Sequence, residues 1–361
     1  MAGCFLPWVA SAQTNQETNL VSPDIQADHR VIFRIRASKA SEVSLWGDWM
    51  PVASPEKMTR DERGIWSITA GPLEPGIAIY NFKMDGIDMA DPINPRLKLR
   101  ARTSASLVEI TANPPALWEA RPVPHGVIEV NWQSSKVIGD TRAFYVYTPP
   151  QYQQNSTRRF PVLYLLHGNN DTAAGWTDVG KANFILDNLI AERKAVPMIV
   201  VMPWGHAAPY NARQTNNTAL FERYLVEDLI PHVEKKYRVA KGRENRALVG
   251  LSMGGGQSLQ IGFERLDLFS ALGAFSAAVP NDFETQFKAL LENSSETNGK
   301  LKLLWMGCGE QDEIFNRTVR LDEILNAHKI HHTFVRLEGR HNYAVWRKCL
   351  AQVAPLLFQK H

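Results

Sequence analysis

The sequence predicts two fold types in one chain: a small β-sandwich, followed by an α/β domain built on a doubly wound sheet. Residues 24–110 contain short strand-like segments separated by turns, with no helical period between them. From Gly126 onward, apolar strand-like segments alternate with helix-like segments, as in a parallel sheet covered by helices. With 361 residues, of which 44% are hydrophobic and 21% charged, the chain is large and apolar enough for two globular domains.

The charge composition argues against nucleic-acid binding. Forty lysines and arginines are balanced by 37 aspartates and glutamates, which gives a formal net charge of +3, and no run of basic residues forms a stripe. No apolar segment reaches the roughly 18–20 residues that a membrane-spanning helix needs. The cysteines and histidines show no metal-ligand spacing, so no metal site is expected.

Residues 1–22 are predicted to be a signal-like segment and a linker. Residues 4–12 form a short apolar stretch that ends in Ala10-Ser11-Ala12, a pattern typical of signal-peptide cleavage, although a basic n-region is missing. We therefore expect a secreted or periplasmic bacterial protein; the alternative is a floppy N-terminal extension. If Cys4 leaves with the signal, Cys308 and Cys349 remain, and the sequence leaves open whether they form a disulfide or stay buried thiols.

An immunoglobulin-like β-sandwich is predicted for residues 23–112. Its clearest strand covers residues 30–37, in which Val31, Phe33 and Ile35 share one face and should point to the core. Further strands are predicted at residues 42–46, 64–70, 77–84 and 104–111, with a short strand from Ile87 after the Asp85-Gly86 turn. Several short strands with turn signals and no helix are typical of this class.

Four motifs of this segment occur in one order, at residues 44–49 (Ser-Leu-Trp-Gly-Asp-Trp), 58–66, 80–86 and 91–95 (Asp-Pro-Ile-Asn-Pro). They resemble the family 48 carbohydrate-binding modules. The resemblance implies glycan binding, for which Trp46, Trp49 and Trp66 are the candidates, because exposed tryptophans can stack on sugar rings. Two alternatives remain open: the rings are core aromatics, or the module packs on the second domain and shapes one wall of its cleft.

Residues 113–125 carry four prolines and are predicted to join the two domains. Residues 126–361 are predicted to form the doubly wound α/β domain. Its expected strands cover residues 127–132, 143–148, 161–167, 198–202, 247–250, 271–275, 301–307 and 332–337. Its expected helices cover residues 182–193, 219–236, 257–264, 283–291, 317–327 and 343–357. The middle strands are continuously apolar, which is typical of a sheet with helices on both faces.

Residues 250–254, Gly-Leu-Ser-Met-Gly, match the G-x-S-x-G nucleophile elbow of α/β-hydrolases. A predicted strand precedes them and a glycine-rich helix start follows, so the serine should stand exposed on a sharp strand-to-helix turn. Ser252 is therefore the candidate nucleophile, and the second domain is predicted to have the α/β-hydrolase fold. The alternative is an ordinary glycine-rich turn with a capping serine.

In this fold an acid and then a base follow the serine along the chain, each just beyond a strand end. The loop at residues 308–312 offers both Glu310 and Asp312, and Asp312 could instead cap a helix that begins near Ile314. The loop at residues 338–342 contains His341, the candidate base.

A serine hydrolase also needs two backbone N–H groups that bind the oxyanion. Met253, directly after the nucleophile, is the first candidate donor. Asn169 is the second, because it lies in the loop after the third strand of this domain, at residues 167–171. His167 in the same loop is interpreted as structural rather than as a base.

Further motifs of the second domain lie at residues 165–168, 175–176, 202–206, 221–228, 250–255 and 339–346. Together they resemble carbohydrate esterase family one, which includes feruloyl and acetyl xylan esterases and is similar to esterase D and enterochelin esterase. The resemblance places the acid at Asp312 and implies no metal or organic cofactor. The cleft is expected to be lined by Trp176, Trp204 and His206. Related chains often carry a small polar residue at the position of Trp204. The tryptophan could narrow the acyl pocket, stack on an aromatic acyl group or be a buried packing residue.

The two resemblances together imply a secreted serine esterase that hydrolyses feruloyl esters on plant cell-wall xylan through an acyl-enzyme. Feruloylated arabinoxylan, or an oligosaccharide from it, would be its partner. Three alternatives remain: an acetyl xylan esterase with a smaller acyl pocket, a siderophore esterase with a cationic cleft, and a non-catalytic glycan-binding protein. The sequence does not predict the oligomeric state or the preferred acyl group.

Overall fold

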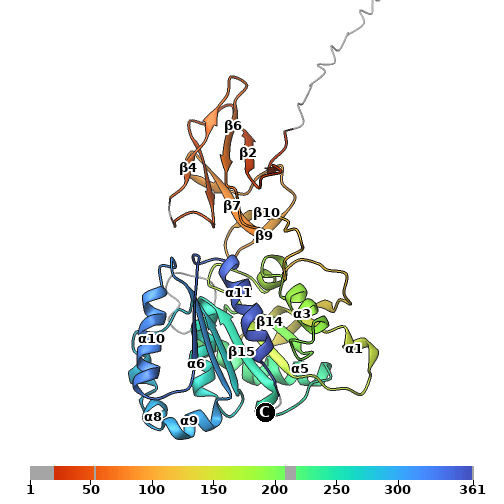
Figure 1. The fold of residues 1–361 in the computed structure, drawn as a ribbon, viewed down its shortest axis with the longest axis vertical. Coiled ribbons are helices and arrows are strands. Elements are labelled where there is room, and N and C mark those ends of the chain that lie inside the picture. Colours follow the sequence, from red (N-terminus) through yellow and green to blue (C-terminus); the bar gives the residue numbers. More distant parts are fainter. Residues whose placement is uncertain (1–19, 53, 208–216, 360–361) are drawn as a thin grey trace, which may run out of the picture.

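The computed structural model describes residues 20–52, 54–207 and 217–359. A β-sandwich lies above an α/β domain, and helix α11 (Tyr343–Val353) reaches the boundary between them (Figure 1). The signal-like segment at residues 4–12 lies outside the described residues. No helix in the described ranges is both long and apolar enough to cross a membrane.

The β-sandwich consists of two sheets with the strand orders β1-β2-β6-β5 and β4-β3-β7-β10-β9, and β8 pairs with β7. Its strands are β1 (Asp24–Ile25), β2 (Val31–Arg36), β3 (Val43–Gly47), β4 (Glu56–Lys57), β5 (Thr59–Arg60), β6 (Ile65–Ala70), β7 (Gly76–Met84), β8 (Ile87–Met89), β9 (Leu97–Leu99) and β10 (Ser104–Ile110). The alternation predicted along β2 is correct, since Val31, Phe33 and Ile35 are at most 3% exposed. Their side chains form the core between the sheets.

The α/β domain contains one eight-stranded sheet with the order β11-β12-β14-β13-β15-β16-β17-β18. Its strands are β11 (Val127–Ser135), β12 (Asp140–Thr148), β13 (Val162–Leu166), β14 (Ile199–Pro203), β15 (Arg246–Leu251), β16 (Ala271–Phe275), β17 (Leu303–Gly309) and β18 (Thr333–Leu337). The pairs β11–β12 and β12–β14 are antiparallel, and the rest of the sheet is parallel. The prediction of an α/β fold preceded by a β-sandwich is confirmed.

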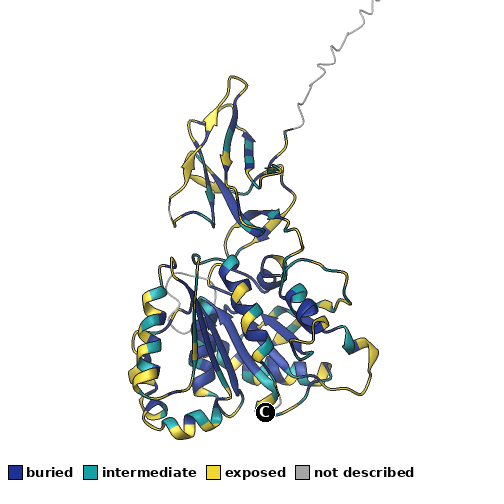
Figure 2. Ribbon diagram, viewed as in Figure 1, coloured by how far each residue is buried: buried dark blue, intermediate teal, exposed yellow. Residues whose placement is uncertain are grey.

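Helices cover both faces of this sheet, and Figure 2 shows its strands buried between them. Along β13, Tyr164 points into the core beneath α5, α6 and α10, whereas Leu163 and Leu165 point into the core beneath α3 and α11. The helices are α1 (Gln151–Gln154), α2 (Gly175–Asp178), α3 (Ala182–Ala191), α4 (Asn217–Arg223), α5 (Ile230–Lys236), α6 (Met253–Glu264), α7 (Phe283–Gln286), α8 (Lys288–Glu292), α9 (Ser294–Lys300), α10 (Phe315–Ala327) and α11.

Three predicted helices differ from the structure. The single helix expected at residues 219–236 is divided into α4 and α5 by a π-helical segment at Tyr224–Leu229. The helix expected at residues 283–291 is two short helices, α7 and α8. The helix expected from residue 257 begins at Met253, so the nucleophile candidate stands directly before its first turn.

The sandwich and the α/β domain share an apolar core. Ile77 and Ile79 of β7 belong to the same buried cluster as Trp346 and Leu350 of α11. The guanidinium of Arg347, which is 2% exposed, donates to the carbonyl of Ile77 at 3.2 Å and to that of Val179 at 2.9 Å. The sandwich is therefore packed on the edge of the sheet where the parallel strands end.

Cys308 of β17 and Cys349 of α11 are buried free thiols. The disulfide that the sequence left open is thus not formed in this structure.

Candidate active site

Ser252 stands on a strained turn between β15 and α6. Its backbone has φ 51° and ψ −116°, a combination that a residue with a side chain rarely adopts. No residue larger than glycine fits at position 250 or 254 without a clash. A Cβ atom on Gly250 would lie 2.3 Å from the carbonyl oxygen of Gly254, and a Cβ atom on Gly254 would lie 2.5 Å from the carbonyl oxygen of His167. The N–H of Ser252 donates to the carbonyl of Phe275 at 2.8 Å and holds the turn against β16. This is the geometry of a nucleophile elbow.

Hydrogen bonds join the serine, the histidine and the aspartate that the sequence singles out. Nε2 of His341 lies 2.9 Å from Oγ of Ser252. Nδ1 of the same ring lies 2.8 Å and 3.0 Å from the two carboxylate oxygens of Asp312. A carboxylate can only accept, so Nδ1 carries the proton and Nε2 is left to accept the serine proton. The structure thus brings the three candidates together in a hydrogen-bonded chain.

Asp312, rather than Glu310, contacts the imidazole. Asp312 is buried, whereas Glu310 is exposed in the same loop. Asp312 also accepts a hydrogen bond from the N–H of Ile314 at 3.0 Å, so the capping role and the contact with His341 occur together. Burial acts to raise the pKa of Asp312, but the bonds from His341 and from the Ile314 N–H outweigh it and lower the pKa below its ordinary value. Asp312 therefore stays ionised at neutral pH and can orient the ring.

Met253 is the first residue of α6, and N–H groups in the first turn of a helix have no acceptor within the helix. The loop that contains Asn169 lies close to the serine, since a Cβ atom on Gly168 would lie 3.3 Å from Cβ of Ser252. The two predicted donors thus belong to two separate segments that both adjoin the nucleophile.

Two buried histidines hold that loop. Nε2 of His206 lies 2.6 Å from the carbonyl of Asn169. Nε2 of His167 accepts from the N–H of Gly205 at 2.9 Å, so its Nδ1 donates to the carbonyl of Gly168 at 2.8 Å. Burial lowers the pKa of His167 to about 4, which keeps its ring neutral. His206 was expected to line the cleft, but it is 1% exposed, and its contact fixes the loop instead.

Neither of the two tryptophans expected in the cleft lines the pocket around Ser252. Trp176 is fully buried: its indole N–H donates to the carbonyl of Leu166 at 3.0 Å, and its ring packs edge-on against Tyr343. The prediction that Trp176 lines the cleft is therefore wrong; it is a core residue. Trp204 follows β14 and is partly buried, and it is not among the described residues that line the pocket around Ser252.

A pocket of about 340 Å³, here called the Ser252 pocket, contains Ser252 and His341. The β-sandwich supplies much of its wall, through Trp46, Asp48, Ile79, Lys98 and Arg100. The guanidinium of Arg100 lies over the ring of Trp46, 5.7 Å from its centre. One of the three tryptophans proposed to bind glycan thus lines this pocket.

The other two sandwich tryptophans pack inward. Trp66 is buried and donates its indole N–H to the carbonyl of Ala37 at 3.0 Å. Trp49 is partly buried and stacks on Phe33, with ring centres 5.9 Å apart. Trp66 is therefore a core aromatic, contrary to the glycan-contact prediction.

Sequence reasoning assigned no site role to several residues that line the Ser252 pocket, among them Asp48, Lys98, Arg100 and Trp346. The ring of Trp346 meets that of His341 edge-on, 5.0 Å away. Burial raises the pKa of Asp48 to about 7, against the opposing effect of Arg347 and Arg100. Asp48 and Trp346 belong to motifs noted in the sequence, at residues 44–49 and 339–346, and this membership was the signal that could have indicated them.

Asp312, Glu313 and His341 are close enough to hold a metal ion, since one potential ligand atom from each lies within 4.8 Å of the others. Two of these residues, Asp312 and His341, already share the hydrogen bond described above.

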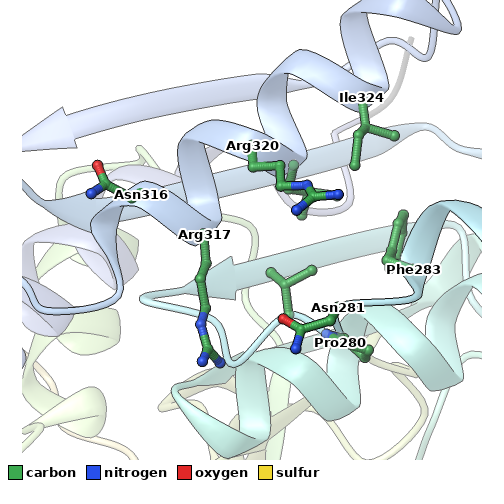
Figure 3. Close-up of a pocket in the computed structure, with 9 residues that line it drawn as sticks. Pro280, Asn281, Phe283, Asn316, Arg317, Arg320 and Ile324 are labelled. Atoms are coloured by element: carbon green, nitrogen blue, oxygen red, sulfur yellow. The ribbon is translucent and has the colours of Figure 1, made fainter.

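A separate pocket of about 170 Å³ lies between α10 and the segment at residues 279–283 (Figure 3). Arg317 and Asn281 line it, and the three hydrogen-bonded site residues do not.

Comparison with known proteins agrees with this geometry. The model of the Esterase family matches residues 135–357. An endo-1,4-β-xylanase/feruloyl esterase of Xylanibacter ruminicola is 30% identical over 351 residues, which cover 93% of this chain and 46% of that protein. An esterase of Mycobacterium tuberculosis is 29% identical over 182 residues, which cover 49% of this chain and 36% of that protein. The chain therefore spans less than half the length of these two relatives.

Solved structures show the same fold. A ferulic acid esterase of Anaeromyces mucronatus, in complex with ferulic acid, aligns with a TM-score of 0.60 and 25% identity over 66% of this chain and 93% of that chain. An enterobactin esterase of Shigella flexneri aligns with a TM-score of 0.65 and 18% identity over 91% of this chain and 93% of that chain. The second alignment extends over most of the chain, so the likeness of fold is not confined to the α/β domain.

Proposed function

The chain belongs to the Esterase family, and on that premise we propose that it is a serine esterase that hydrolyses feruloyl esters on plant cell-wall xylan. The observation that carries the proposal is the hydrogen-bonded chain from Ser252 through His341 to Asp312. The proposed substrate is supported by the likeness to a relative that joins xylanase and feruloyl esterase in one protein and matches 93% of this chain.

In the proposed reaction, Oγ of Ser252 attacks the ester carbonyl while Nε2 of His341 takes the serine proton. Asp312 stabilises the imidazolium, and the N–H groups of Met253 and Asn169 bind the oxyanion of the tetrahedral intermediate. His341 then protonates the sugar oxygen, which leaves as an alcohol, and the feruloyl group stays on Ser252. Water gives its proton to His341 and attacks this acyl-enzyme, which releases ferulate and restores the serine. The reaction written in this way uses no metal or organic cofactor.

Two features favour an aromatic acyl group over the alternatives. A pocket of about 340 Å³ is larger than an acetyl group needs and lies within the range of pockets that bind small-molecule ligands of drug size. A ferric catecholate is strongly anionic, whereas the cations of this pocket lie beside acids: Lys98 pairs with Asp171, and Arg100 interacts with Asp48. The enterobactin esterase likeness nevertheless makes siderophore hydrolysis the second candidate, because that alignment includes most of this chain.

An assay panel separates the candidates: methyl ferulate, 4-nitrophenyl acetate and a ferric catecholate ester, each with wild type and with Ser252→Ala. We expect turnover of methyl ferulate that the substitution lowers by a factor on the order of 10⁴–10⁶. Turnover of the acetyl ester alone would favour an acetyl xylan esterase, and turnover of the catecholate ester alone would favour a siderophore esterase. Full activity in Ser252→Ala would exclude Ser252 as the nucleophile.

We further propose that the protein is exported, on the basis of the Ala10-Ser11-Ala12 pattern. Expression of the full sequence in a bacterial host should give a periplasmic or secreted chain that begins at Gln13, as measured by mass spectrometry. A chain that retains residues 1–12 and stays in the cytoplasm would contradict export.

A further inference from the structure

The turn after β16 holds the backbone of the nucleophile. The N–H of Ser252 donates to the carbonyl of Phe275, the last residue of β16, at 2.8 Å. The N–H of Ala278 donates to the carbonyl of Ser252 at 2.9 Å. Both polar groups of the Ser252 backbone are therefore bonded to residues 275–278, here called the β16 turn.

Ser276 lies within the β16 turn and has a strained backbone. Its φ is 42°, in the left-handed region that a residue with a Cβ atom rarely adopts. The residue is fully buried, and its N–H donates to the carbonyl of Gly307 in β17 at 2.8 Å. Strain of this kind persists only where the surrounding structure holds it, and it is concentrated at functional sites. Ser276 is thus held in a costly conformation beside the strand that leads to the acid.

The side chain of Ser276 connects a thiol to the catalytic carboxylate. Sγ of Cys308 lies 3.7 Å from Oγ of Ser276 and donates its proton to that oxygen. Burial raises the pKa of Cys308 to about 12, so the thiol keeps this proton at neutral pH. The hydroxyl of Ser276 in turn donates to the carboxylate of Asp312, and this hydrogen bond lowers the pKa of Asp312. The bond that Ser276 accepts from Cys308 leaves its single proton for Asp312.

Asp312 needs such a donor because its side chain is shielded from water. The carboxylate is 0% exposed, whereas the ring of His341 is 19% exposed. Its two oxygens offer about four acceptor positions, and the His341 ring and the N–H of Ile314 fill only part of them. A buried carboxylate stays ionised where hydrogen-bond donors replace the lost water. The hydroxyl of Ser276 is a third donor to this carboxylate.

We propose that Ser276 and Cys308 are positioning residues that extend the hydrogen-bonded chain of the active site. The extended chain runs from Cys308 through Ser276, Asp312 and His341 to Ser252. Neither Ser276 nor Cys308 lines the Ser252 pocket, so both act through Asp312: Ser276 orients its carboxylate, and Cys308 orients the Ser276 hydroxyl. This inference rests on the proposed function in one respect, that the last three residues hydrolyse an ester together, and it holds for any acyl group.

The test measures kcat and KM for methyl ferulate and for 4-nitrophenyl acetate in Ser276→Ala and Ser276→Gly. Both variants lack the hydroxyl, but glycine adopts a φ of this sign without strain, so Ser276→Gly should fold even where Ser276→Ala is destabilised. We expect kcat to fall about tenfold in both variants, with KM changed by less than about twofold, because a hydrogen bond to a charged group is lost while the pocket is unaltered.

The matched control is Ser258→Ala. Ser258 is also fully buried, and its hydroxyl donates to the carbonyl of Gly254 within α6 at 2.8 Å. The control therefore removes a buried hydroxyl that has no bond to the acid, and it should keep wild-type kcat. Wild-type kcat in Ser276→Gly, or an equal loss in Ser258→Ala, would overturn the inference.

Cys308 is tested by a double-mutant cycle. Cys308→Ala should lower kcat about threefold, and Cys308→Ser, which keeps a donor, should restore most of it. Because Cys308 is proposed to act only through Ser276, Cys308→Ala should cause no further loss when Ser276 is already alanine. Multiplication of the two separate losses in the double variant would show that Cys308 acts independently, and would overturn the extended chain.

The inference and the proposed substrate fail in different ways. Turnover of 4-nitrophenyl acetate without turnover of methyl ferulate by wild type would overturn the feruloyl substrate, and the kcat of Ser276→Gly for the acetyl ester would still decide the inference. Turnover of methyl ferulate that is the same in wild type and Ser276→Gly would overturn the inference and leave the proposed function intact.

Discussion

Lys98 of the β-sandwich and Asp171 of the α/β domain form a buried ion pair across the domain interface, with side chains 4% and 7% exposed. The same carboxylate accepts the hydroxyl of Tyr343 at 2.6 Å. The N–H of Asp171 donates to the carbonyl of Gly168 at 3.2 Å, which closes the turn that contains Asn169. The sandwich is therefore tied, through one lysine, to the loop that is proposed to bind the oxyanion.

Replacement of Lys98 by methionine should weaken both stability and catalysis. The substitution leaves the Asp171 carboxylate buried without its cation, and broken buried pairs of this kind cost about 3–5 kcal/mol. We expect a loss of that order in urea unfolding, together with a fall of about tenfold in kcat for 4-nitrophenyl acetate and a smaller change in KM, because the loop loses its position.

The matched control is Arg96→Met, since Arg96 forms an exposed ion pair with Glu109 near the same strand, β9. Exposed pairs contribute about 0–1 kcal/mol, so this variant should remain close to wild type. The double variant Lys98→Met/Asp171→Asn removes the unpaired charge and should recover part of the lost stability. Equal losses in Lys98→Met and Arg96→Met would mean that the buried pair has no special role.

Asp312→Asn should lower kcat by about 10⁴-fold, because an amide cannot hold the imidazole in the tautomer that accepts the serine proton. The control is Glu310→Gln, which changes the exposed acid of the same loop and should keep wild-type kcat. Steady-state kinetics with methyl ferulate measures both. A severe loss in Glu310→Gln with normal activity in Asp312→Asn would reverse the assignment of the acid.

The sequence could predict Ser252 and His341 because each follows the end of a strand that its own local pattern reveals. The same reasoning gave a loop with two acids, Glu310 and Asp312, and only the family resemblance selected Asp312. The sequence could not predict Lys98 and Arg100, because β9 is a three-residue strand with no periodicity and its side chains act on the other domain. Trp176 was assigned to the cleft on motif position alone, and burial of its ring against Tyr343 overrides that assignment. Local sequence patterns can therefore indicate the residues of the hydrogen-bonded chain. The residues that line the Ser252 pocket depend on packing between the two domains, which such patterns do not reveal.

His206→Ala tests whether a buried histidine positions the oxyanion loop. The substitution removes the contact between Nε2 of His206 and the carbonyl of Asn169, so the loop can move away from the serine. Because a donor in an oxyanion hole contributes about 10²–10³ in kcat, a displaced but present donor should cost about tenfold, with KM nearly unchanged. His331→Ala is the control, since His331 is exposed before β18. An increase in KM at constant kcat would instead indicate that His206 binds substrate.

Asp48 gives the protein a pH-dependent stability of opposite sign to that of an ordinary ion-paired acid. Burial raises its folded-state pKa to about 7, above the ordinary value of 3.8, so the folded state holds a proton that the unfolded state has lost. Stability therefore falls as the pH rises from about 4 to about 7, and changes little beyond that range. Asp48→Asn, which is always neutral, should be more stable than wild type at pH 8, and this advantage should be clearly smaller at pH 5, where less of the wild-type stability has been lost. Urea unfolding at the two pH values measures this difference.

The control is Asp140→Asn, a change at an exposed carboxylate, which should not change stability differently at the two pH values. A stabilisation by Asp48→Asn that is equal at pH 5 and pH 8 would show that Asp48 is ionised in the folded protein throughout this range.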